Sequence, residues 1–191
     1  MNPNVWTVCF NHHSYDLPIK KISVSTSIAI VDFIHCVSFM HDVAIEANRY
    51  MNHNISNAVD IIVTPECRCV TLATQLALMN GCQLVMLRKS LKAYDHPDTA
   101  YCSGPCQSLI ALKPSQLYLT QDQAAMMKGK RVLVLDDVAS TGRTFIALNK
   151  LLCQAGIKAD FFAIFDEDSV KDPLFAALPS YYFLRTLPVI L

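Results

Sequence analysis

Two adjacent carboxylates followed by small and hydroxylated residues form the segment of this sequence with the clearest chemical character. The segment reads Asp136-Asp137-Val138-Ala139-Ser140-Thr141-Gly142-Arg143-Thr144 and directly follows the apolar run 131–135. In open α/β sheets, ligands bind at the carboxyl ends of strands, which is where the two acids fall. Neighbouring like charges are costly to desolvate together, so the pair predicts a partner that brings sugar hydroxyls or a divalent cation.

The residues after the acids are typical of an anion site. Gly142 permits a strained or left-handed turn, and the small residues before it leave backbone amides accessible. Thr144 is expected to start a helix, whose N-terminus attracts negative charge. No Gly-Lys-Ser/Thr follows, so this is not a Walker loop. Asp and Thr residues that merely cap a helix are the structural alternative, but the whole arrangement favours a sugar diol site beside a phosphate site.

The elements that would position this loop follow from apolar patterns. Short runs rich in Val, Ile and Leu predict strands buried on both faces, at 60–64, 83–87, 131–135 and 159–165. Helical spacing predicts helices between or before them, at 30–51, 70–79 and 144–154. The last two end at Asn80-Gly81 and Ala155-Gly156, which are usual helix stops. This alternation predicts an α/β fold with a mostly parallel, twisted sheet flanked by helices.

Two regions lie outside that alternation. The segment from about 90 to 120 is rich in proline and shows no helical period in its first part, which predicts a flexible lid loop. Its second part, 107–120, alternates weakly and suggests a β-hairpin. Residues 1–27 have little pattern and predict a small cap, which the C-terminus would complete. We therefore expect one domain over 1–191 with a cap and a lid.

Composition narrows the function classes. The 191 residues are 52% hydrophobic and 17% charged, and the formal net charge is zero, so the chain is globular. No basic block supports a nucleic-acid partner. No signal peptide is apparent, and the apolar stretch 28–40 is interrupted by Asp32 and His35 and is too short to span a membrane. We expect a cytoplasmic location, with the eight cysteines as reduced thiols, because their spacings fit neither a disulfide framework nor a zinc site.

The run 132–144 resembles the phosphoribosyl pyrophosphate (PRPP) motif of the type I phosphoribosyltransferases, in which an apolar strand, two acids and a Thr-Gly-x-Thr loop follow one another. The resemblance extends from about residue 60 to 165 and is nearest to the adenine and xanthine branch. There, Thr64-Pro65-Glu66-Cys67-Arg68 resembles the pyrophosphate loop, and Arg88-Lys89 resembles the basic pair at the end of the next strand.

The resemblance implies a fold, a reaction and a set of roles. The reaction would be transfer of ribose 5-phosphate from PRPP to a purine base, with release of pyrophosphate, dependence on Mg²⁺ and a homodimeric protein. Asp136 and Asp137 would hold the ribose hydroxyls and, directly or indirectly, Mg²⁺. The 5′-phosphate would be cradled by Ala139, Ser140, Thr141, Gly142, Arg143 and Thr144. Pyrophosphate would meet Glu66, Cys67, Arg68, Arg88 and Lys89.

The acceptor side departs from the family pattern. Lys113 falls where adenine-type enzymes carry a lid glutamate and xanthine-type enzymes carry a lysine, so it is a catalytic candidate, with a solvated lysine as the alternative. Asp16-Leu17-Pro18-Ile19 resembles an adenine-type opening motif, but the aromatic residue expected after it is missing. Asp166-Glu167-Asp168 would either line the base site or form a solvated turn. The acceptor thus stays open between adenine and xanthine or hypoxanthine-guanine.

Two other functions remain compatible with the sequence. One is a PRPP-binding regulator, or a catalytically weak homologue, on the same fold. Such regulators usually carry a DNA-binding helical domain, for which this chain has no basic patch. The other is a phosphoribosyltransferase for a non-purine base such as orotate or uracil.

Overall fold

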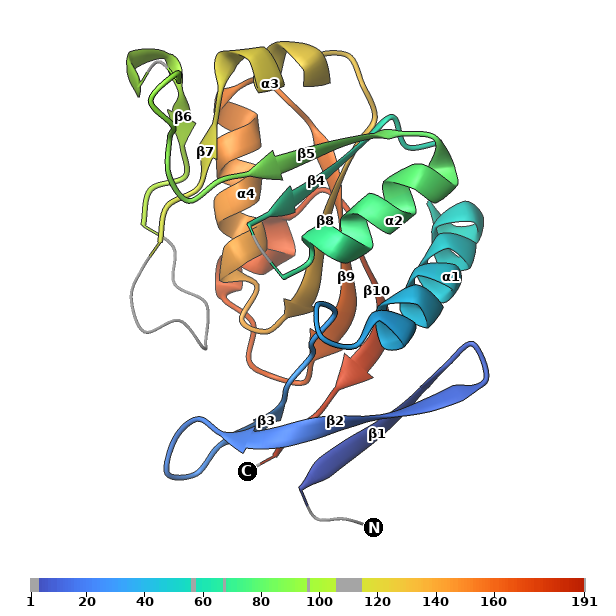
Figure 1. Cartoon of the computed structure of the whole chain (residues 1–191). Coiled ribbons are helices and arrows are strands. Elements are labelled where there is room, and N and C mark those ends of the chain that lie inside the picture. Colours follow the sequence, from blue (N-terminus) through green and yellow to red (C-terminus); the bar gives the residue numbers. More distant parts are fainter. Residues whose placement is uncertain (1–3, 56–57, 67, 96, 106–114, 191) are drawn as a thin grey trace.

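A five-stranded parallel sheet forms the centre of the molecule (Figure 1). The computed structural model describes residues 4–55, 58–66, 68–95, 97–105 and 115–190. The sheet contains β4 (Ile61–Pro65), β5 (Gln83–Leu87), β8 (Val132–Ala139), β9 (Ala159–Glu167) and β10 (Tyr181–Leu187). The strand order is β10-β9-β8-β4-β5, and each neighbouring pair is parallel. The four strands that the apolar runs predict are confirmed, whereas the edge strand β10 has no counterpart among the predictions.

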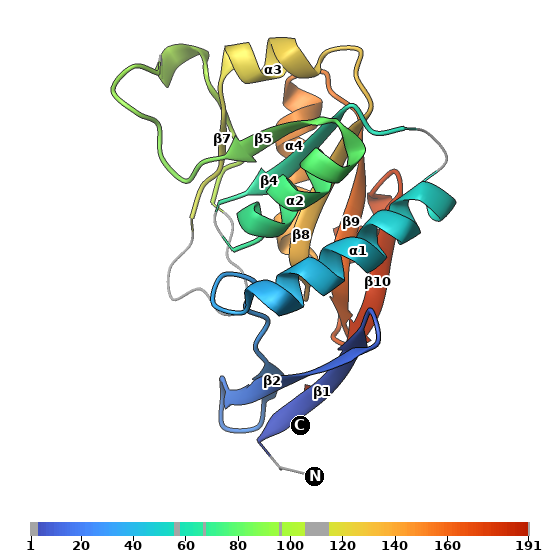
Figure 2. The same cartoon turned by 45° about the vertical axis from the view of Figure 1, so that its right-hand side comes forward.

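Helices cover both faces of this sheet, as Figure 2 shows. α1 (Val37–Asn54) and α2 (Val70–Asn80) lie on one face and α4 (Arg143–Gln154) on the other. Along β8, Leu133 and Leu135 enter the core beneath α1 and α2, while Val132 and Val134 enter the core beneath α4. Because both faces are buried, the strand shows no polar alternation, which is why a continuous apolar run predicted it correctly.

One predicted helix boundary is wrong. The expected helix over 30–51 begins only at Val37 and ends at Asn54, and residues 30–36 are not helical. The physical reason lies in Asp32, whose Oδ1 accepts the backbone amides of Ile34 at 2.9 Å and His35 at 3.0 Å. This side-chain turn competes with helical hydrogen bonding and delays the helix start.

A second, antiparallel sheet lies beyond the carboxyl ends of β9 and β10 (Figure 1). This cap sheet contains, in order, β1 (Val5–Phe10), β2 (His13–Lys21), β3 (Ser27–Ala29) and β11 (Val189–Ile190). Asn11 and His12 turn the chain between β1 and β2 with positive φ angles of 47° and 68°. Phe10 packs edge-on against Phe39 of α1 and Phe165 of β9. The cap sheet is thereby attached to the main core.

The segment between β5 and β8 is built from short elements, the 3-10 helix η1 (Pro97–Thr99), β6 (Tyr101–Cys102), β7 (Tyr118–Leu119) and α3 (Gln121–Met127). β6 and β7 pair antiparallel, so the expected hairpin starts earlier than residue 107, and 106–114 lie outside the described residues. The sequence pattern does not predict α3, which starts at a capping box between Thr120 and Gln123. A 3-10 helix, η2 (Pro173–Ala177), follows β9. Within the described chain, no helix is both long and apolar enough for a membrane span.

Candidate functional site

The two carboxylates of β8 lie beyond the part of this strand that pairs with β4. β4 pairs with β8 only from Val132 to Val134, whereas the pairing of β8 with β9 continues to Ala139. Asp136 Oδ1 accepts the amide of Asp137 at 2.9 Å, and Asp137 Oδ1 accepts the amide of Val138 at 2.9 Å. Both acids are thus held at the carboxyl end of the sheet, next to the residues that follow β4.

The electrostatics of this pair are unbalanced. Asp137 is 5% exposed, and its Oδ2 lies 3.2 Å from Nη2 of Arg68. Burial, and then the negative charge of Asp137, raise the pKa of Asp136 well above its ordinary value, and Arg68 only partly opposes this. One guanidinium therefore faces two adjacent carboxyl groups. Such a pair is stabilised by a ligand that supplies hydroxyl donors or positive charge.

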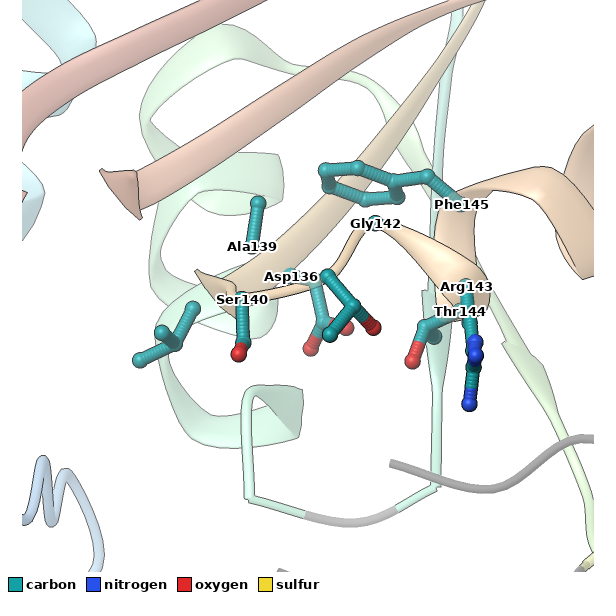
Figure 3. Close-up of a pocket in the computed structure, with 9 residues that line it drawn as sticks. Asp136, Ala139, Ser140, Gly142, Arg143, Thr144 and Phe145 are labelled. Atoms are coloured by element: carbon teal, nitrogen blue, oxygen red, sulfur yellow. The ribbon is translucent and has the colours of Figure 1, made fainter. Parts of the chain in front are cut away.

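The loop after β8 forms a pocket whose polar groups share one side, as Figure 3 shows. The oxygens of Asp136, Ser140 and Thr144 point to the open side, and the ring of Phe145 lies on the other. The lining residues are Asp136, Val138, Ala139, Ser140, Thr141, Gly142, Arg143, Thr144 and Phe145. The Oγ of Ser140 is buried without a hydrogen-bond partner among the described residues. An orphaned buried hydroxyl calls for a partner, and an anion at the start of α4 would provide it.

Gly142 is required here by its conformation and by its surroundings. Its φ is +78°, and its carbonyl accepts the amide of Ile146 at 3.0 Å, so it caps α4. A Cβ at this position would lie 2.1 Å from Cδ2 of Phe175. Phe175 belongs to η2, so this element is seated directly on the loop.

The residues predicted to meet pyrophosphate lie at the ends of β4 and β5. Glu66 Oε2 accepts the amide of Lys89 at 2.9 Å, which joins the two strand ends. Arg68 reaches Asp137 from the segment after β4. Arg88 is held by Asp95 at 2.6 Å, and its side chain is 17% exposed. Arg68 and the exposed Lys89 are therefore the cations presented at this edge, while Arg88 is committed to the segment after β5. The predicted Cys67 and Lys113 lie outside the described residues.

A lysine that the sequence pattern does not single out supports the loop from behind. Lys171 Nζ donates to the backbone carbonyls of Ala139 at 2.8 Å, Ser140 at 2.7 Å and Glu167 at 2.8 Å. It also lies 3.0 Å from Asp166 Oδ1. The only signal in the sequence was a single lysine after a cluster of acids, which is ordinarily a solvated residue.

The acids after β9 divide between different surroundings. Asp166 accepts the hydroxyl of Tyr181 at 2.5 Å in addition to its contact with Lys171. Glu167 is 2% exposed, and its Oε2 has no hydrogen-bond partner among the described residues. Asp168 is exposed. A solvated acidic turn therefore describes Asp168 alone, and Asp166 belongs to the support of the loop.

Six of the eight cysteines lie within the described chain. The six described cysteines are free, and burial raises the pKa of the Cys69 thiol well above its usual value. No group of three His, Cys, Asp or Glu side chains among the described residues could hold a metal ion.

The family model of the phosphoribosyl transferase domain matches residues 38–171, more than two thirds of the chain. The chain belongs to this family. The matched range contains both acids, the whole loop and the strand ends around them, and it leaves out all four strands of the cap sheet.

Curated relatives of this phosphoribosyltransferase-family chain are named after the purine bases hypoxanthine and guanine. The hypoxanthine/guanine phosphoribosyltransferase of Methanobacterium lacus is 31% identical over 119 residues, which are 59% of this chain and 55% of that protein. The protein of the same name from Methanotorris igneus is 38% identical over 103 residues, 51% of this chain and 48% of that protein. The chain thus spans about half the length of the curated relatives it matches.

Solved structures share the fold over nearly the whole chain. Adenine phosphoribosyltransferase from Giardia lamblia, complexed with 9-deazaadenine, superposes with a TM-score of 0.70 at 18% identity and covers 95% of this chain and 93% of that one. The adenine phosphoribosyltransferase from Rhodothermus marinus gives 0.65 at 17% identity, with 96% and 94% covered. The predicted α/β fold with a parallel sheet is confirmed.

Proposed function

We propose that this chain is a purine phosphoribosyltransferase, which transfers ribose 5-phosphate from PRPP to a purine base and releases pyrophosphate. The observation that carries the proposal is the end of β8, where Asp136 lines an anion pocket (Figure 3) and the neighbouring Asp137 lies 3.2 Å from Arg68. The names of the relatives support a purine as acceptor. We also propose a single domain with a cap and a lid over about 90–120, a homodimer and a cytoplasmic location.

The donor would bind along the loop. Asp136 and Asp137 accept hydrogen bonds from the ribose hydroxyls. The amides and hydroxyls of 139–144, with the N-terminus of α4 behind them, hold the 5′-phosphate. This assignment accounts for two features that would otherwise be costly, the unbalanced acid pair and the buried Ser140 hydroxyl without a partner.

The leaving group would lie toward the ends of β4 and β5. Positive charge develops at the anomeric carbon as pyrophosphate departs, and the cations Arg68 and Lys89 stabilise the departing charge. Arg88 joins them if it exchanges its contact with Asp95. Closure of the lid excludes water from the reacting carbon. On this proposal Lys113 handles a proton of the base.

The acid pair fits Mg²⁺ bound together with substrate. Asp137 Oδ2 is buried, and its contact with Arg68 at 3.2 Å is an ion pair without hydrogen-bond geometry, so the oxygen makes no hydrogen bond among the described residues. Mg²⁺ commonly binds one or two carboxylates together with waters and substrate phosphate oxygens, so a site without three protein ligands suits it. Asp136 and Asp137 would hold the ion, which when bound offsets the charge of the leaving pyrophosphate.

A base screen tests the function. The full chain is incubated with PRPP, Mg²⁺ and, in turn, adenine, hypoxanthine, guanine, xanthine, orotate and uracil, and released pyrophosphate is measured. Release with a purine is expected. Release only with orotate or uracil would mean that the acceptor is a pyrimidine base and that the purine assignment is wrong. Binding of PRPP without release for any base would favour a regulator.

Asp137→Asn tests the donor site. The variant loses a charged acceptor worth about 1.5–3 kcal/mol, so we expect the Kd for PRPP with Mg²⁺ to rise at least tenfold in calorimetry. Asp122→Asn, at an exposed acid of α3, is the matched control and should bind like the wild type. Equal PRPP affinity in both variants would remove the sugar assignment.

A further inference from the structure

We propose that Lys171 is a positioning residue that turns the backbone amides of the phosphate loop (residues 139–144) toward the donor. The inference rests on the proposed function and goes beyond it, because Lys171 contacts no lining side chain and acts through the backbone. Its ammonium donates three hydrogen bonds to backbone carbonyl groups, two of them in the loop.

The orientation follows from peptide geometry. Three consecutive carbonyls of the loop accept hydrogen bonds from one short segment: those of Ala139 and Ser140 from Lys171 Nζ, and that of Thr141 from the amide of Asp172 at 2.9 Å. In a trans peptide the C=O and the following N–H point in opposite directions. The amides of Ser140 and Thr141 therefore point away from Lys171, and the amide of Gly142 points away from Asp172. Ser140, Thr141 and Gly142 all line the pocket.

A lysine is well suited to this position. Its ammonium has three donors and no acceptor, and here it meets three carbonyls and the carboxylate of Asp166. Asp166 is fixed in turn by Tyr181, whose pKa is raised by burial and by Asp166 itself, so the phenol stays a donor. The side chains of Lys171 and Asp166 are 22% and 21% exposed. The charge behind the loop is therefore held in place rather than free in solvent.

The arrangement predicts which ligand will depend on Lys171. A residue that orients the loop amides affects ligands with a 5′-phosphate. Pyrophosphate lies, on the proposed function, at the ends of β4 and β5, and neither strand provides a contact of Lys171. Loss of the ammonium should thus weaken the binding of ribose 5-phosphate much more than the binding of pyrophosphate.

The test compares two probes on the full chain by calorimetry. Lys171→Met removes the ammonium and keeps the aliphatic stem, and Lys158→Met, at an exposed lysine before β9, is the matched control. We expect Lys171→Met to raise the Kd for ribose 5-phosphate at least tenfold and the Kd for magnesium pyrophosphate less than twofold. Lys158→Met should leave both unchanged. Hydrogen exchange of peptides covering 139–144 should be faster in Lys171→Met, with β4 and β5 unaltered.

Other outcomes would overturn the inference. Unchanged ribose 5-phosphate affinity in Lys171→Met would do so, and an equal loss for both probes would show general damage instead of positioning. If Lys171→Met does not fold, Lys171→Arg takes its place, with a threefold or larger loss for ribose 5-phosphate expected and no loss overturning the proposal. A wild-type chain that binds neither probe and releases no pyrophosphate would instead refute the proposed function.

Discussion

The phosphate loop and the cap sheet each depend on a buried carboxylate, but the two sites are electrostatic opposites. Asp42 of α1 is 5% exposed and accepts hydrogen bonds from Tyr15 at 2.5 Å and Asn11 at 3.0 Å, with His13 Nδ1 at 2.7 Å. These contacts, that of Tyr15 first, lower its pKa to about 2. Asp136 has the reverse shift. The carboxylate of Asp42, with its hydrogen-bond partners in place, fastens the cap hairpin, whereas the pair Asp136 and Asp137 still has acceptors for a ligand.

The two regions also differ in how the chain builds them. The loop is one contiguous stretch between a strand and a helix, and the family match includes all of it. The cap sheet joins both ends of the chain, because β3 pairs with β11 through Ile28↔Val189 and Ser27↔Ile190. The family match therefore includes the proposed donor site and leaves out the strands of the cap sheet. Substitutions in the loop should therefore change PRPP binding, and substitutions at the contacts of the cap sheet should change stability.

Gly142→Ala should give the largest effect. The new Cβ would meet Phe175 at 2.1 Å, and the φ of +78° is unfavourable for alanine, so the loop must move. A misplacement of about 1 Å in a positioning element can cost about a hundredfold. We expect the Kd for PRPP, measured by calorimetry, to rise by that factor. The contacts of Asp42 and the cap sheet should stay unchanged.

Gly129→Ala is the matched control for that variant. Its φ of +71° is similar, but a Cβ there would have no atom within 4 Å. The variant should lose about 1 kcal/mol of stability through backbone strain and keep its PRPP affinity. If both glycine variants bind PRPP equally well, the close contact with Phe175 has no role in donor binding.

Asp42→Asn should affect stability and leave donor binding intact. It removes a buried charged acceptor, so the free energy of unfolding should fall by about 2 kcal/mol in urea titrations at pH 7. Because the folded-state pKa lies below the ordinary 3.8, this contribution is complete above pH 4 and is lost as the pH falls toward 2. Asp16→Asn, at an exposed acid of the same hairpin, should change stability by less than 0.5 kcal/mol. Weaker PRPP binding in Asp42→Asn would contradict the separation of the donor site from the contacts of the cap sheet.

Asp136→Asn should stabilise the fold while weakening the donor site. The raised pKa means that ionising Asp136 costs folding free energy, so its penalty is absent below the ordinary value of 3.8, grows as the pH rises above that value and is complete once the pH exceeds the raised pKa. Asparagine keeps an oxygen for the amide of Asp137 and carries no charge. We expect the Tm at pH 8 to rise by about 2 °C or more, with weaker PRPP binding. A lower Tm would show that the carboxylate is not strained.

The same contrast explains what could be predicted from the sequence. The strands and the loop were predictable because each is local: burial on both faces gives an apolar run, and the acids and Gly142 stand in one contiguous motif with a recognisable family resemblance. The roles of Lys171 and Phe175 were not, because they depend on which backbone groups face them after folding. Arg88 resembled a pyrophosphate ligand, but the chain folds back and pairs it with Asp95. β11 is two residues long, and its partner strand lies at the other end of the sequence.

Lys89→Met should give the smallest measurable effect. Lys89 is exposed, so its attraction for pyrophosphate is screened and worth about 0.5–1 kcal/mol, a two- to fivefold rise in Kd at low salt. Lys128→Met, at an exposed lysine after α3, should not change that Kd. Because a screened charge fades with ionic strength, the difference between Lys89→Met and the wild type should close near 0.5 M salt. The Gly142→Ala effect is steric and should persist there. A Lys89 effect that also persists would mean that its ammonium contacts pyrophosphate in a site shielded from solvent.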